Sequence, residues 1–77
     1  MEEVTTLAAL RPGRGGEIVA ITAAAPQRRR LMELGFIPGG RIEVLQASPW
    51  GDPVAYAVCG AVIALRRNDA KTITIKC

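Results

Sequence analysis

The chain has 77 residues and a formal net charge of +3, with 49% hydrophobic and 22% charged residues. This length provides one small domain with a thin stability margin and little apolar area for a deep substrate cavity. The composition is that of a globular chain and excludes a disordered one. The charge bias is mild, and the aromatic residues Phe36, Trp50 and Tyr56 do not interleave with the basic run, unlike a nucleic-acid-binding surface.

Cysteine usage and the first residues bear on the compartment. The two cysteines, Cys59 and Cys77, are fewer than a small secreted domain carries. The acidic start at residues 1–3 is unlike the positively charged start of a signal peptide, and no apolar run reaches membrane-spanning length. We therefore expect a reduced cytoplasmic protein that forms a single domain over residues 1–77.

The first turn and the first long strand follow from the residue types. Pro12 fixes φ at the second position of a turn, and Gly13 can take the positive φ that a type II turn needs next. The glycines at positions 15 and 16 are expected to extend this loop. The β-branched run 17–22 then predicts a strand whose side chains alternate between two faces.

A short helix is expected between Pro26 and Leu34. Proline suits the first helical turn, where its missing N–H is not needed, and good helix formers follow it. Gly35 stands where a helix ends in the left-handed conformation. Leu31 and Leu34 fall on one face of this helix.

The rest of the chain alternates short apolar runs with Gly/Pro turns. Pro38 and Gly39 repeat the chemistry of the first turn, and the loop 48–53 holds two prolines and a glycine. Strands are predicted at 41–46, 54–59, 61–65 and 72–75, with a polar turn at 66–71. About five strands and one helix predict a mainly β fold closed into a small barrel, because closure removes exposed edges.

The sequence offers no catalytic or metal-binding constellation. It has no histidine, so Cys59 lacks the usual base for nucleophilic catalysis. Cys59 and Cys77 do not form a CxxC pair, and the carboxylates lack metal-ligand spacing. The glycines at 13–16 precede a strand and lack the Gly-Lys-Ser/Thr ending of a phosphate loop. We expect no enzyme, no cofactor and no metal site, with Cys59 a small core residue of its strand.

Two features stand out from an ordinary solvated surface. Three arginines follow one another in the first turn of the helix, where positive charge opposes the helix dipole. A solvated helix face is the simpler interpretation, since successive helical residues point about 100° apart. Trp50 either packs over the barrel end or anchors a partner. The candidate partner-contact residues are Arg28, Arg29, Arg30, Leu31 and Trp50.

An ordered set of motifs between Leu7 and Ile75 resembles the FeoA family of small bacterial ferrous-iron-transport proteins. Its most specific piece is Arg30-Leu31-x-x-Leu34-Gly35-x-x-Pro38-Gly39, with Gly51-Asp52-Pro53 downstream. The SH3-like C-terminal domain of diphtheria-toxin-repressor-type regulators shares this pattern. The motif residues expected to form structural turns are Gly13, Gly35, Pro38, Gly39, Gly51, Asp52, Pro53 and Gly60.

The resemblance implies an SH3-like barrel with the helix inserted after the first long strand. It also implies a cytosolic role beside FeoB, the GTPase-linked ferrous iron permease, through contact with its cytosolic portion at the inner membrane. Weak self-association stays open, and neither nucleic acid nor membrane insertion is expected. The alternative is a free-standing SH3-like module of a metal-dependent transcriptional regulator, or a nucleic-acid-associated adaptor. The chain carries no DNA-binding helix set, which favours the transport role.

Overall fold

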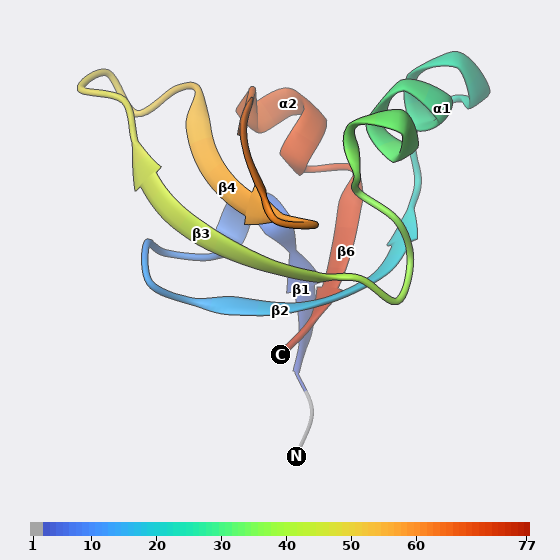
Figure 1. Cartoon of the computed structure of the whole chain (residues 1–77), viewed down its shortest axis with the longest axis horizontal. Helices are drawn as coiled ribbons and strands as arrows, with labels where there is room; N and C mark the ends of the chain where they lie inside the picture. The colour runs from blue at the N-terminus through green and yellow to red at the C-terminus, as the bar shows by residue number, and fades with distance from the viewer. Residues whose placement is uncertain (1–2) are drawn as a thin grey trace.

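The computed structural model describes residues 3–77, which form one curved sheet with short helices beside it (Figure 1). The elements in chain order are β1 (Val4–Thr6), the 3-10 helix η1 (Leu7–Ala9), β2 (Gly15–Ile21), α1 (Ala25–Leu34), β3 (Arg41–Ala47), β4 (Val54–Val58), β5 (Ala61–Leu65), α2 (Arg67–Ala70) and β6 (Ile73–Lys76). All neighbouring strands are antiparallel, in the order β1-β6-β2-β3-β4-β5.

The sheet differs from the predicted barrel in strand number and in closure. The strand that was not predicted is β1, which pairs with the outer side of β6. It has three residues, too few to give a periodic sequence signal. A barrel requires its first and last strands to pair with each other. Within residues 3–77 β1 and β5 do not pair, so the predicted five-stranded closed barrel is corrected to an open six-stranded sheet.

Strand β2 begins earlier than expected because its glycines let neighbouring strands approach closely. Gly15 and Gly16, predicted to lie in a loop, are the first residues of this strand. A Cβ at position 15 would lie 2.7 Å from the carbonyl oxygen of Ile42, and one at position 16 would lie 2.6 Å from Ile75 Cγ2. These glycines therefore serve close packing within the sheet and not a turn.

The helix α1 matches its predicted bounds to within one residue. Pro26 lies in its first turn, and Gly35 ends it with φ of 116°, its N–H donating to the carbonyls of Leu31 and Met32. The polar segment expected to be a turn at 66–71 contains the one-turn helix α2. Asp69 links the two helices, as it accepts hydrogen bonds from α1.

The core lies on one face of the sheet and continues under the helices. Strand β4 shows the alternation, since Val54, Tyr56 and Val58 are buried while the alanines between them are less buried. Tyr56 and Phe36 meet edge to face, with ring centroids 6.4 Å apart. The buried hydrophobic residues are Leu7, Ile18, Ile21, Leu31, Phe36, Ile42, Val44, Val54, Tyr56, Val58, Leu65, Ala70, Ile73 and Ile75.

Candidate protein-binding surface

Within the described residues, 3–77, the hydroxyl oxygen of Ser48 is buried, and most other polar side chains lie at the surface. No buried residue in this range is polar or charged apart from the phenol of Tyr56. Burial raises the pKa of this phenol; the charge of Arg67 lowers it and that of Asp52 raises it, both to a smaller extent. No three Cys, Asp or Glu side chains in this range come together as metal ligands would. Any binding site formed by polar or charged side chains must therefore lie at the surface.

The three consecutive arginines of α1 have different surroundings. Arg30 forms an ion pair with Asp69, with 3.3 Å between Nη2 and Oδ2, and Gln27 Nε2 donates to the other carboxylate oxygen of Asp69. Arg30 therefore helps to join α1 to α2. Arg28 and Arg29 are exposed and form no ion pair within residues 3–77. Of the three consecutive arginines, these two have a charge that is available to a partner.

Two shallow hollows lie beside these arginines. One has a volume of about 380 Å³ and the other about 320 Å³, and Arg28 and Met32 line both. The first hollow is also lined by Ala25, Arg29, Glu33 and Ile37. The second is also lined by Val19, Ala20, Ile21 and Pro38. An apolar floor under a positive rim suits an apolar side chain that is followed by a carboxylate.

Leu31 does not belong to this surface. It is fully buried and is the one residue of α1 that the core encloses completely. Its place on the helix stripe that faces the core explains this burial. Leu31 is therefore removed from the candidate contact residues, and a substitution there would act through folding.

Trp50 is presented on a well-bonded loop. Its side chain is 88% exposed, so it does not pack over the end of the sheet. Around it, Gly51 N–H donates to Ser48 O at 2.8 Å, and Ser48 N–H donates to Pro53 O at 3.0 Å. Arg67 Nε donates to Gly51 O at 2.9 Å. The exposure of this indole therefore occurs on a turn that several hydrogen bonds hold in place.

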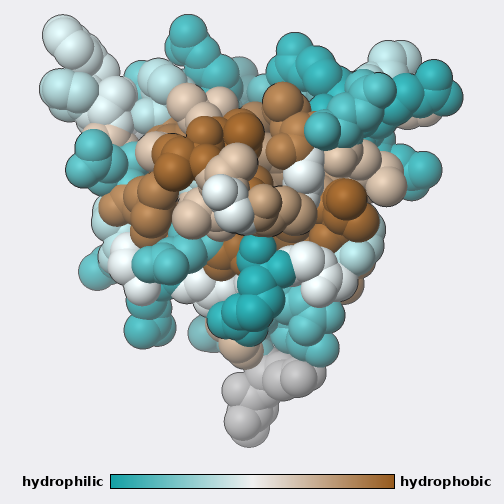
Figure 2. Space-filling model, in the orientation of Figure 1, coloured by the Kyte–Doolittle hydropathy of each residue, from teal (hydrophilic) through white to brown (hydrophobic). Residues whose placement is uncertain are grey.

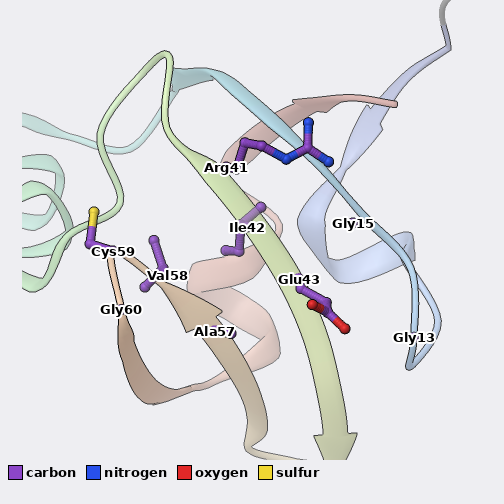
Figure 3. A pocket seen from close by; sticks show the side chains of 9 residues that line it. All are labelled: Gly13, Gly15, Arg41, Ile42, Glu43, Ala57, Val58, Cys59 and Gly60. Carbon is purple, nitrogen blue, oxygen red and sulfur yellow. The ribbon is translucent and has the colours of Figure 1, made fainter.

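A wider hollow of about 570 Å³ lies over β2, β3 and the turn between β4 and β5 (Figure 3). β3 carries Arg41 and Glu43 along it, and Cys59 and Gly60 lie at one side (Figure 3). Cys59, expected in the core, is exposed in a two-residue turn with φ of 51°, and its thiol donates to Gly35 O at 3.3 Å. The core prediction for Cys59 is wrong because the chain reverses one residue earlier than expected.

The glycines expected in turns have positive φ: Gly13 88°, Gly35 116°, Gly39 92°, Gly51 85° and Gly60 76°. Pro38 lies in the turn before Gly39, and the Asp52–Pro53 peptide is cis. Asp52 Oδ1 accepts the backbone N–H of Arg67 at 2.9 Å. Because Arg67 begins α2, this carboxylate satisfies one of the free donors of that helix from a distant loop.

An apolar surface that sequence reasoning missed covers the outward face of the last hairpin. Figure 2 shows apolar side chains gathered across this side of the molecule. The exposed or half-buried residues of β3 to β5 that contribute to it are Leu45, Ala55, Ala57, Val62 and Ala64. The available signal is the stretch 53–65, which contains no charged residue. The alternation pattern does not reveal this surface, because the outward positions of these strands are as apolar as the inward ones.

The fold is that of a small SH3-like domain. FeoA of Stenotrophomonas maltophilia, described as a procaryotic SH3 domain protein and solved with zinc, superposes with a TM-score of 0.80 and 27% identity, covering 92% of this chain and 88% of that one. FeoA of Chlorobium tepidum gives a TM-score of 0.84 and 35% identity, covering 92% and 69% of the two chains. A manganese-dependent transcriptional repressor shares the fold alone, at 24% identity and a TM-score of 0.83 over 42% of its chain.

A family model for the FeoA domain matches residues 5–77, so the chain belongs to the FeoA family. The Fe(2+) transport protein A/Fe(2+) transporter FeoB fusion protein of Porphyromonas gingivalis is 36% identical over 70 residues. That match covers 91% of this chain and 8% of the fusion protein, so the chain spans a small part of that relative. Within residues 3–77 no helix has the length and hydropathy needed to cross a membrane.

Proposed function

We propose that this protein is a cytosolic accessory protein of ferrous iron uptake that works by binding the cytosolic part of FeoB, without catalysing a reaction. The observation that carries the proposal is the fusion relative, in which a segment like this chain and FeoB form one polypeptide. When two domains are covalently linked, each has a high effective concentration near the other, so a weak contact between them is enough. When the domains are separate chains, the same contact must be made by binding affinity alone. The proposed location is the cytoplasm, at the inner membrane when FeoB is bound.

The proposed contact uses exposed groups that fold stability does not require. Arg28 and Arg29 lie beside an apolar floor and lack ion-pair partners within residues 3–77. Trp50 is a large aromatic side chain on a hydrogen-bonded turn, and exposed aromatic residues of this kind often contribute strongly to interfaces. The turn glycines and Asp52 are proposed to shape the domain and not to touch the partner.

The proposal is tested by co-purification with tagged FeoB from the native membrane, with and without GTP analogues. Trp50→Ala and the double change Arg28→Gln/Arg29→Gln should each reduce recovery of the protein with FeoB and slow iron-limited growth. Arg30 is kept in both variants because it bonds Asp69. If both folded variants and a gene deletion leave ferrous iron uptake unchanged, the transport role fails.

The second candidate function is that of a regulator module, since the fold also occurs in a manganese-dependent transcriptional repressor. Binding to duplex DNA would weaken steeply with salt, because phosphate contacts release counterions. Binding to FeoB through the indole, an apolar floor and the two arginines should change less over the same salt range, because fewer charges are paired than along a DNA backbone. A titration of the protein with duplex DNA and with FeoB at low and high salt separates the two functions.

A further inference from the structure

Strand β5 is an open sheet edge without the usual protection. It is one of the two ends of the sheet, and it has five residues where the other end, β1, has three. Natural edge strands are commonly guarded by charged side chains, proline or a bulge. β5 contains neither charge nor proline, and its ladder with β4 runs from Val54–Leu65 to Val58–Ala61 without a register shift. This edge can therefore accept another strand.

The register of the hairpin determines which backbone groups face outward. Val58 and Ala61 flank a two-residue turn, and such flanking residues form a hydrogen-bonded pair. The alternation of an antiparallel ladder then directs Ile63 toward β4, and Val62 and Ala64 away from it. Within residues 3–77 no hydrogen bond outside the strand ladders involves residues 61–65. Four outward N–H and C=O groups are thus available.

The sheet face beside this edge is apolar on β4 and β5. Ala57 pairs with Val62 and Ala55 pairs with Ala64, so small side chains form two rows that lead to the edge. Val62 is 68% exposed, and the exposed side chain of Leu45 extends the apolar surface onto β3. An added strand would continue these rows, placing every second side chain beside Val62 or Ala64. The neighbours that suit those positions are apolar and uncharged.

We propose that β5 binds an extended segment of the cytosolic part of FeoB as an added antiparallel strand, an inference that rests on the proposed function. The segment is uncharged where it passes Val62 and Ala64. It carries a carboxylate where it reaches Arg66, since Arg66 is the first charged residue after the stretch 53–65 and forms no ion pair within residues 3–77. Backbone hydrogen bonds supply affinity, and the apolar rows with Arg66 supply selectivity.

A second copy of this chain fits the edge less well. Each copy has a net charge of +3, and Arg66 would meet no carboxylate on the stretch 53–65 of its counterpart. A specific interface between folded proteins buries about 1,200–2,000 Å² in total, more than one edge strand of five residues provides. An extended segment needs only the edge itself to pair with β5, whereas a second folded copy would need this larger area.

The test compares two changes at Ala64 in binding to purified FeoB from the same genome. In Ala64→Pro the outward N–H is lost, while the ladder with β4 is kept because that N–H does not point toward β4. In the control Ala64→Thr the N–H remains, and threonine favours strands. We expect Ala64→Pro to weaken binding about tenfold, since strand pairing is blocked, and Ala64→Thr to change it about twofold at most. Melting curves first establish that both variants are folded.

A second measurement on the unaltered protein covers the case in which Ala64→Pro does not fold. Amide hydrogen exchange by NMR should show new protection of Val62 and Ala64 when FeoB is added. If FeoB binds the unaltered protein while Ala64→Pro binds equally well, or while these two amides stay unprotected, the edge inference is overturned and the proposed function stands. If FeoB does not bind at all, both fail. A dimer of the purified protein that Ala64→Pro dissociates would overturn the assignment to FeoB in favour of a second copy.

Discussion

Gly39 is a glycine that its backbone conformation requires, although the space around it would admit a side chain. Its φ is 92°, and a Cβ built there would have no heavy atom within 4 Å. The cost of a side chain at this position is therefore conformational strain and not a clash. Gly16 is the opposite case, because a Cβ there would lie 2.6 Å from Ile75 Cγ2 and 2.7 Å from Lys76 O. Glycine is required at both positions, for different physical reasons.

Gly39→Val should destabilise the protein by about 1–2 kcal/mol, because a β-branched residue is strained at positive φ. In a domain of this size each kcal/mol lowers Tm by about 4–8 °C. Gly39→Asn is the control and should cost less, since asparagine tolerates the left-handed conformation. Thermal melts followed by circular dichroism measure both. Equal melting of Gly39→Val and the unaltered protein would show that this turn does not need a glycine.

Tyr56 gives the stability a pH dependence at the alkaline end. Burial raises the pKa of its phenol, and Arg67 and Asp52 add smaller opposing contributions. The unfolded chain releases this proton near pH 10, while the folded protein holds it to higher pH. The folded state then binds more protons than the unfolded state, so stability falls as pH rises. This contribution to stability is fully present below the pKa of the phenol in the unfolded chain, and it is lost as the pH rises through the pKa in the folded protein.

Tyr56→Phe should flatten the alkaline part of the stability curve. The variant retains the ring that packs against Phe36 but has no phenol to ionise. The difference in free energy of unfolding between the two proteins should stay constant below about pH 9 and change in favour of the variant above about pH 10. Urea titrations at a series of pH values measure it. Parallel curves across the whole range would contradict a raised pKa for Tyr56.

At the scale of elements, regular alternation and turn chemistry could be predicted, and close packing could not. The strands at 41–46 and 61–65 and the helix ending at Gly35 follow from side-chain periodicity and Gly/Pro positions. The two glycines that open β2 look like loop residues unless the neighbouring strands are known. The helix α2 is one turn long, and the Asp52 carboxylate that bonds its first N–H comes from another loop.

The arginines of α1 differ in their expected contribution to stability, because Arg30 pairs with Asp69 of α2 while Arg28 and Arg29 do not. Arg30→Gln should lower stability by up to about 1 kcal/mol, since it removes a partly exposed ion pair with Asp69. The double change Arg28→Gln/Arg29→Gln should stay within about 0.5 kcal/mol of the unaltered protein, as neither residue forms an ion pair within residues 3–77. Urea unfolding measures both variants. A larger loss in the double variant than in Arg30→Gln would contradict this division of roles.

At the scale of the whole molecule, the open sheet has a core on one face and an apolar, uncharged area on part of the other. The family could be predicted from the ordered motifs, and the exposure of Trp50 was one of two open readings. The apolar face of β4 and β5 and the free edge were not predicted. The sequence predicts a closed barrel, in which that edge would be paired. Leu31 was included as a contact because a sequence motif does not distinguish buried positions from exposed ones.

The central claim is that this protein binds FeoB directly. It is tested most directly by an equilibrium titration of the purified protein with purified FeoB of the same genome in detergent, followed by the fluorescence of a label placed away from Trp50 and β5. We predict saturable binding in about the micromolar range that is weakened by Trp50→Ala. Absence of saturation, or an equal signal with an unrelated membrane protein in the same detergent, would contradict the claim.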